Sequence, residues 1–357
     1  MKNRNALIYA VALLSLLAWG FERWLVRGGS GETRSAMVRA AGFMQDALSA
    51  LRACREKSGI PIDAAADPGR TGIVGIDSSP VTTTLGSLEA KRTTANPAWA
   101  SLLVRLLDEC GVGAEDPVAI GASSSFPGFI VATLSAVKAL GARPLVIASL
   151  GASQWGANRP DFGWTEMSGC LKEAGLFTDP VIALSLGGEG DAGQDLSEEG
   201  RKILLSKMAG TGILRISQSE LARNVEARME AYDRAAGEKT IKAFVNIGGS
   251  WANIGTDASV LDLPPGLSRT RLSYRPGRNG VLQAMSARGV PVIHLLNIRG
   301  LCRRYGLPWD PAPLPRFGGD ALDKLARPGG ATFYILAGAY FALLFLAGLR
   351  LRRLGRF

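Results

Sequence analysis

Three consecutive serines, Ser123, Ser124 and Ser125, follow a short apolar segment and precede Phe126-Pro127-Gly128. A serine on a sharp turn between a strand and a helix can act as a nucleophile, as in the G-x-S-x-G elbow of hydrolases. In Gly121-Ala122-Ser123-Ser124-Ser125, serine stands where the last glycine of that elbow belongs. The three serines are thus candidate nucleophiles on an imperfect motif.

A serine nucleophile also needs a base, and the chain contains one histidine, His294. It lies in the apolar run Val292 to Leu296, where a lone histidine is more often a packed core residue than a catalytic base. An acid such as Asp77 or Asp191 is the alternative. The sequence leaves this choice open, and Asp77 is kept with the serines as a candidate catalytic residue.

Five loops rich in glycine and hydroxyl residues are expected to follow predicted strands, where backbone amides can approach an anionic ligand. Glycine and serine are also ordinary turn residues, but their recurrence in five loops favours a ligand site. The candidate ligand-binding residues in these loops are Ser153, Gln154, Trp155, Asn158, Asn246, Gly248, Gly249 and Ser250.

Other chemistries are disfavoured by what the sequence lacks. One histidine and four scattered cysteines provide no zinc constellation, and no G-x-x-x-x-G-K-[ST] phosphate loop is present. The glycine-rich loop after residue 186 carries Glu189 and Asp191, which would repel phosphate. We therefore expect no metal, no nucleotide and no other cofactor.

The formal net charge of +10 suggests at first a protein that binds nucleic acid. Residues 1–27 and 329–357 carry most of that charge, which leaves the middle near +3. No acid occurs between Asp262 and Asp310, a segment that includes Arg271, Arg275 and Arg278. These arginines form a candidate anion-binding face, or are simply solvated, and no nucleic-acid partner is expected.

Short apolar runs alternate with longer segments of helical periodicity, which predicts an α/β fold with a mostly parallel sheet and helices on both faces. The predicted strands are Gly72–Ile76, Val118–Ala122, Leu145–Ser149, Val181–Leu186, Ala243–Ile247 and Val292–Leu296. The predicted helices are Ser35–Arg55, Trp99–Cys110, Pro127–Leu140, Trp164–Ala174, Leu196–Met208, Ser219–Ala236 and Gly280–Ala287.

One uncharged apolar run near each end, Ala6–Phe21 and Ala331–Leu349, predicts a transmembrane helix flanking the α/β fold on either side. The predicted organisation is a membrane anchor in 1–27, an α/β domain in 28–328, and a second span with a basic tail in 329–357. A cleaved signal peptide is the alternative for the first run. Basic flanks favour the inner membrane with both termini cytoplasmic and the main domain extracytoplasmic, in the periplasm.

Cys54, Cys110, Cys170 and Cys302 would then lie in a compartment that permits disulfides. Four cysteines allow three pairings, and spacing does not choose among them. Four buried free thiols that act as small apolar side chains are the alternative.

The same loops carry a resemblance to a known family. Ser124 to Gly128, Ala148 to Asn158, Leu184 to Gly188 with Asp191, and Asn246 to Gly249 resemble the poly-γ-glutamate system proteins of bacteria, in the same order over most of the middle domain. Gly151-Ala152-Ser153-Gln154-Trp155-Gly156-Ala157-Asn158 is the most specific part. The resemblance implies a role beside the membrane machinery that makes and exports a polymer of γ-linked glutamate.

Three functions follow as hypotheses. The first is a membrane-anchored accessory protein of poly-γ-glutamate synthesis or export, with the anionic polymer, a glutamate-containing substrate, the membrane synthase components and the membrane itself as partners. The second is an amide hydrolase or transferase that trims, releases or attaches the polymer with a rim serine. The third, a purely structural anchor, gives no reason for five polar loops at strand ends.

Overall fold

The computed structural model describes residues 9, 12–13, 15–16, 31–178, 180–315, 325 and 330–354. The chain divides into two compact units, of which the larger is Ala36–Gly318 and the smaller combines Met1–Ser35 with Gly319–Phe357. The larger unit lies within the predicted domain 28–328.

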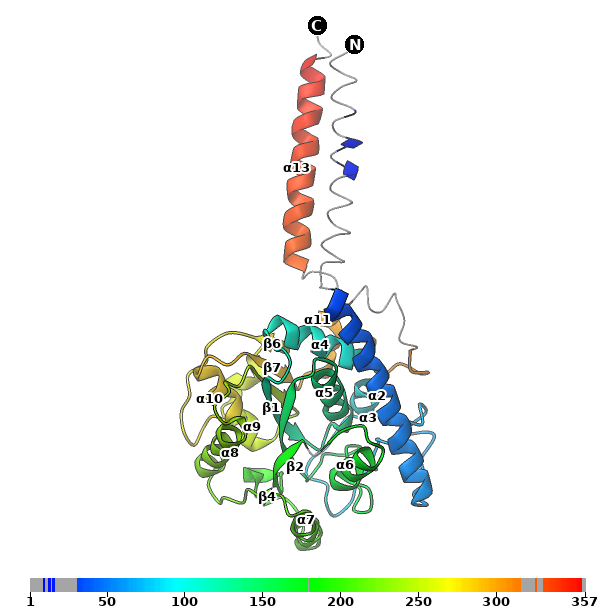
Figure 1. Cartoon of the computed structure of the whole chain (residues 1–357), viewed down its shortest axis with the longest axis vertical. Coiled ribbons are helices and arrows are strands. Elements are labelled where there is room, and N and C mark those ends of the chain that lie inside the picture. Colours follow the sequence, from blue (N-terminus) through cyan, green and yellow to red (C-terminus); the bar gives the residue numbers. More distant parts are fainter. Residues whose placement is uncertain are drawn as a thin grey trace. The chain divides into compact units, whose positions relative to one another are not determined.

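The larger unit is built on a seven-stranded sheet with the order β4-β3-β2-β1-β5-β7-β6 (Figure 1). Every pairing is parallel except that of β6 with β7. The strands are β1 Pro117–Ser123, β2 Arg143–Ser149, β3 Val181–Ser185, β4 Leu214–Arg215, β5 Ala243–Ile247, β6 Gly266–Ser268 and β7 Val292–Leu295. The predicted mostly parallel sheet is therefore confirmed.

Helices lie in the connections between the strands, because parallel neighbours need long crossover connections. They are α2 Gly31–Lys57, α3 Leu88–Thr94, α4 Ala98–Glu109, α5 Pro127–Ala139, α6 Trp164–Glu173, α7 Glu198–Thr211, α8 Leu221–Ala236, α9 Trp251–Ile254, α10 Val281–Ala287, α11 Ile298–Tyr305 and α13 Gly330–Leu354. Two short 3-10 helices are η1 Glu189–Asp191 and η2 Ala258–Asp262.

The two faces of the sheet are covered by different helices. On one face, α5 contacts β1, β2 and β5, and α3 and α4 pack against α5 (Figure 1). On the other, α8 and α10 pack on alternate strand residues such as Ala119, Ile147 and Phe244. The central strand β1 is buried along its whole length, which is why its sequence is small and apolar rather than alternating.

The predicted strand Gly72–Ile76 is wrong, because this segment does not join the sheet. It is extended, but its backbone pairs with the loop after β2: Gly75 N–H donates to Trp155 O at 3.0 Å. The side chain of Asn158 bonds both the N–H and the C=O of Ile76, at 2.9 and 2.8 Å. The Asn158 amide thus bonds the backbone N–H and C=O of Ile76 that a neighbouring strand would otherwise pair with.

The strand order reverses at β1. The chain adds β2, β3 and β4 on one side of β1 and then returns to place β5 on the other. In open α/β sheets such a reversal leaves a crevice outside the carboxyl ends of the two strands, because their outgoing loops diverge. Ser123 ends β1, and Gly248-Gly249-Ser250 follows β5, so the crevice is formed by residues of two predicted loops.

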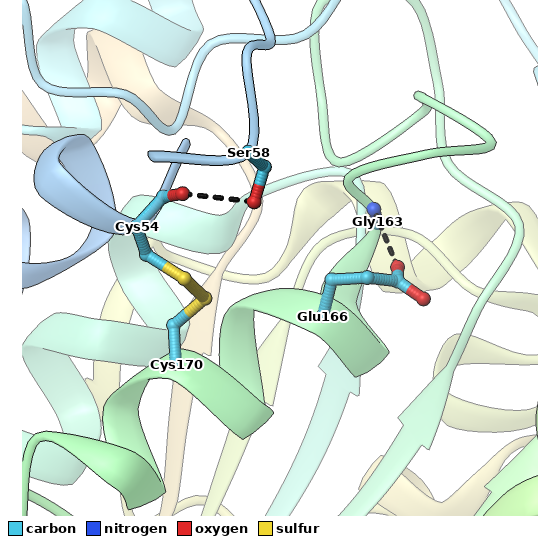
Figure 2. The surroundings of a disulfide bond; sticks show 5 residues. All are labelled: Cys54, Ser58, Gly163, Glu166 and Cys170. Atoms are coloured by element: carbon cyan, nitrogen blue, oxygen red, sulfur yellow. Dashed lines mark hydrogen bonds between the residues drawn. A yellow bond between two sulfur atoms is a disulfide. The ribbon is translucent and has the colours of Figure 1, made fainter. Parts of the chain in front are cut away.

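A disulfide joins α2 to α6 through Cys54 and Cys170, with Cα atoms 6.1 Å apart (Figure 2). Nearby, the Glu166 carboxylate accepts from the N–H of Gly163 at 2.8 Å and caps the start of α6. Cys110 and Cys302 are free. The structure thus forms one disulfide and leaves two free thiols, which matches neither a full pairing of the four cysteines nor the alternative of four free thiols.

Within the residues described, no helix has both the length and the apolarity needed to cross a membrane. Most of the first predicted span, Ala6–Phe21, lies outside the described residues.

Candidate functional site

A pocket of about 560 Å³ opens at the carboxyl ends of β1, β2 and β5, at the reversal of strand order. Its wall combines loops after these strands with the segment that leads into α3 and with residues after β7. The polar, charged and aromatic side chains of the wall include those of Ser87, Lys91, Ser123, Ser125, Phe126, Ser149, Ser153, Asp195, Ser250, Trp251, Arg299 and Trp309.

The pocket contains a chain of polar contacts that starts at a lysine. Lys91 Nζ donates to Ser153 Oγ at 2.8 Å and lies 3.7 Å from the centroid of the Phe126 ring. The backbone N–H of Ser153 donates to Ser125 Oγ at 2.9 Å, and Ser123 Oγ donates to the same oxygen at 3.0 Å. The loops after β1 and β2 are therefore joined to α3 at the pocket.

Lys91 is 3% exposed, although it lines the pocket. Burial lowers the pKa of its amine from 10.5 to about 7, because the charged form loses solvation. At neutral pH a substantial fraction of this lysine is therefore uncharged and can accept a proton. Sequence reasoning missed Lys91, because nothing in Glu89-Ala90-Lys91-Arg92 distinguishes it from a solvated surface lysine.

The three candidate serines after β1 have different surroundings. Ser123 and Ser125 line the pocket, and Ser125 is the more exposed of the two. Ser124 does not line it; the residue is fully buried, and its Oγ has no hydrogen-bond partner among the described residues. A substrate in the pocket could therefore meet Ser123 and Ser125 but not Ser124.

In the loop after β2, only Ser153 of the four predicted ligand-binding residues lines the pocket. Asn158 is fully buried and bonds Ile76, which makes it part of the support for the pocket wall. Gln154 accepts from Gly86 N–H at 3.2 Å and donates to Asp77 at 3.0 Å. Trp155 has a positive φ of 62° and pairs through its backbone with Gly75 and Ile76.

Asp77 itself is exposed and does not line the pocket. Its carboxylate accepts from the Gln154 amide, on the outer side of the extended segment that replaces the predicted first strand. The structure therefore does not bring Asp77 together with the serines.

At the end of β5, Gly249 and Ser250 line the pocket. Ser250 is 8% exposed, and its Oγ has no hydrogen-bond partner among the described residues. A buried hydroxyl of this kind is costly unless a ligand or water satisfies it. Gly248 has a φ of +78°, and a Cβ there would lie 2.9 Å from Ser123 Cβ, so glycine permits the loops after β1 and β5 to meet.

Asn246 and His294 form a buried pair on the neighbouring strands β5 and β7. The Asn246 amide lies 2.9 Å from His294 Nδ1 and also donates to Gly248 O at 2.9 Å. Burial lowers the pKa of His294 to about 4, so the imidazole is neutral at physiological pH. His294 does not line the pocket, and no candidate serine is its hydrogen-bond partner.

A buried ion pair supports the ends of β2 and β3. Arg228 on α8 donates to Asp191 at 2.6 Å, and both side chains are completely buried. Ser149 and Ser185 donate to the same carboxylate at 2.9 and 3.0 Å. Asp191 is thus occupied by a guanidinium and two hydroxyls, which leaves it unsuited to the role of a free base.

The cations of the predicted basic face do not line the pocket. Arg271, Arg275 and Arg278 are exposed on the segment between β6 and α10. Arg299, at the start of α11, does line the pocket, and its guanidinium lies 4.3 Å from the centroid of the Trp309 ring. Lys91 and Arg299 are therefore the pocket's cations, with Asp195 as the acid of its wall.

No family model, curated protein or solved structure matches the chain.

Proposed function

We propose that this chain is a membrane-anchored protein of a bacterial poly-γ-glutamate system whose pocket binds a segment of the anionic polymer. The observation that carries the proposal is the composition of the pocket wall. Eight serine and threonine residues, Lys91 and Arg299 line it, against one acid, Asp195. Hydroxyls and cations are the partners that carboxylates prefer, and the Ser250 hydroxyl has no hydrogen-bond partner among the described residues.

The pocket also suits an extended chain better than a compact apolar ligand. Leu85, Leu296, Trp251 and Trp309 supply apolar surface beside the polar groups, which matches the methylene groups and carboxylates that alternate along γ-linked glutamate. The resemblance in the loops after β1, β2, β3 and β5 supports the choice of this polymer.

Membrane anchoring at both ends is part of the proposal and is argued from the apolar sequences, since no described helix meets the length and apolarity needed to cross a membrane. Residues 331–349 contain no charged residue, and apolar side chains of α13 such as Ile335, Phe341 and Phe345 are exposed. Ser15 Oγ lies 2.7 Å from Tyr340 OH, which supports packing of the first apolar run against α13. Contact with synthase components in the membrane follows as a further role of these helices.

The test is binding of poly-γ-glutamate to the full-length chain in detergent, followed by tryptophan fluorescence because Trp251 and Trp309 line the pocket. We expect Arg299→Ala to weaken binding by about tenfold or more, since a hydrogen bond to a charged group contributes about 1.5–3 kcal/mol. The matched control is Arg223→Ala, an exposed arginine of α8.

A triple variant distinguishes binding at the pocket from binding at the basic face formed by Arg271, Arg275 and Arg278. Reversal of charge at Arg271, Arg275 and Arg278 should weaken binding mainly at low salt if that face assists the polymer. Unchanged binding at low and high salt would exclude the face while leaving the pocket. If Arg299→Ala and Arg223→Ala bind equally well, the pocket is not the polymer site.

A further inference from the structure

Ser153 and Lys91 stand out among the hydroxyl and amine groups of the pocket. Lys91 is a buried amine within hydrogen-bond distance of one serine, 2.8 Å from Ser153 Oγ. Both groups line the pocket and so can reach a bound ligand. An amine held in low dielectric beside a hydroxyl is the arrangement by which a lysine can activate a serine in place of histidine.

Among the described residues, no other pocket serine has an amine at its hydroxyl: Ser87 Oγ donates to the Glu89 carboxylate at 2.6 Å, and Ser250 Oγ has no partner. Ser149 Oγ donates to the Asp191 carboxylate, which already pairs with Arg228. Ser123 Oγ donates to Ser125 Oγ, and Ser125 Oγ accepts both that bond and the Ser153 N–H. Ser125 therefore acts as a positioning residue that holds the backbone of Ser153, while Ser153 alone has an amine at its oxygen.

We propose that Ser153 is a nucleophile and Lys91 its general base, and that the pair cleaves a γ-glutamyl amide through an acyl-serine ester. The choice of this amide rests on the proposed function. The assignment of the two residues rests on their geometry alone.

The reaction balances with water as the co-substrate. Lys91 Nζ takes the proton of Ser153 Oγ while that oxygen bonds to the amide carbonyl carbon. The C–N bond breaks, and Nζ passes the proton to the leaving nitrogen, which departs as an amine. Water then attacks the ester carbonyl, Nζ takes its proton and returns it to Ser153 Oγ as the C–O bond breaks. A free carboxylic acid leaves, and both side chains are restored.

The charges around Lys91 are compatible with this role. Glu89 and Arg92 are its neighbours on α3, Arg92 pairs with Asp310 at 2.5 Å, and Asp195 and Arg299 lie on the pocket wall. Burial is the cause of the lowered pKa of Lys91, near 7. The reactivity of Ser153 should therefore rise with pH and reach half its maximum near pH 7.

The experiment treats the full-length chain in detergent with a fluorescent alkyl fluorophosphonate, which esterifies activated serines and releases fluoride. We expect one label, located at Ser153 by peptide mass spectrometry. Ser153→Ala should remove it, and Lys91→Met should slow it by about 100-fold or more, the usual contribution of a general base. Ser259→Ala and Lys239→Met, both at the surface, are the matched controls.

Lys91→Arg separates base catalysis from charge. Arginine keeps the positive charge but does not deprotonate in this pH range, so the variant should label as slowly as Lys91→Met and lose the pH dependence. Normal labelling of Lys91→Arg, labelling at Ser123 or Ser125 instead, or no labelling of the folded wild-type chain would overturn the assignment. Circular dichroism verifies folding in each case.

The same preparations, incubated with poly-γ-glutamate, test the substrate. Shortening of the polymer by the wild type but not by Ser153→Ala supports the whole proposal. Labelled Ser153 without polymer binding would retain the nucleophile and reject the proposed function. Polymer binding without labelling or shortening would support the proposed function and reject Ser153 as a nucleophile.

Discussion

Lys91 depends on its surroundings for its chemistry more than any other residue of the pocket. Glu89 and Arg92 beside it in the sequence are charged, yet its side chain is buried and contacts Phe126 and Ser153. Burial of an amine costs free energy, because the charged form gives up its hydration. A buried lysine that has no salt bridge to a carboxylate among the described residues is uncommon in a purely structural role, which is why perturbed groups in a cleft indicate functional sites.

At the residue scale, the burial of His294 predicts that the stability of the protein depends on pH. The pKa of folded His294 is about 4, below the usual 6.5, so between these values the unfolded chain binds a proton that the folded chain does not. The stabilisation by neutral His294 is therefore complete above about pH 6.5 and is lost as pH falls toward 4. The loss should amount to roughly 3 kcal/mol.

Urea unfolding of the wild type and of His294→Gln, measured from pH 7 to pH 4, tests this. We expect the free energy of unfolding of the wild type to fall relative to that of the variant over this range. If the difference in free energy of unfolding between the two proteins stayed constant with pH, the imidazole would have an ordinary pKa and would be more accessible to solvent than in the structure.

At the scale of the elements, the loops after β1 and β5 determine whether the pocket forms. Gly248 lets them approach, since its φ is +78° and a Cβ would lie 2.9 Å from Ser123 Cβ. On the next pair of strands, the Arg228–Asp191 pair ties the carboxyl ends of β2 and β3 to α8. The positions of the loops that carry the serines therefore depend on Gly248 and on the buried Arg228–Asp191 pair.

Gly248→Ala is predicted to lower the melting temperature and to displace Ser123. A left-handed backbone costs a residue with a Cβ about 1–2 kcal/mol, and the close contact adds to that cost. The matched control is Gly210→Ala on α7, where a Cβ meets nothing within 4 Å and φ is not positive. Thermal unfolding should show a lower melting temperature for the first variant and an equal or higher one for the second. Equal melting temperatures would mean that the loop adjusts freely.

At the scale of the whole molecule, the strand order decides where chemistry can occur. The pocket opens at the reversal of strand order at β1, and residues between Thr83 and Lys91 form part of its wall. The Cys54–Cys170 disulfide joins α2 to α6, across 116 residues of sequence. Disulfides persist in oxidising compartments, which supports the proposed extracytoplasmic domain.

The disulfide gives a whole-molecule prediction about location. Chain isolated from membranes and denatured without reductant should be alkylated at Cys110 and Cys302 only, and at all four cysteines after reduction, as measured by intact mass. The Cys54→Ser/Cys170→Ser variant should be less stable by about 2–4 kcal/mol, since the bridge restricts the unfolded chain. Alkylation of four cysteines without reductant would contradict both the bridge and the oxidising location.

The sequence by itself determined the α/β class, most of the strands and helices, and the loops that form the rim. These are local properties: buried parallel strands require continuous apolar runs, and a helix that packs on one face requires apolar residues at helical spacing. The same locality explains why Ser123, Ser125, Ser153, Gly249 and Ser250 were predicted as site residues and do line one pocket.

Only the tertiary structure decided the partners of those residues. Lys91 meets Ser153 across 62 residues of sequence, and Gly72–Ile76 pairs with a loop although its composition is that of a strand. Such contacts depend on the strand order and on the path of the connecting segments, which periodicity does not encode. The lowered pKa of Lys91 also depends on the tertiary structure, because residues distant in the chain bury its amine.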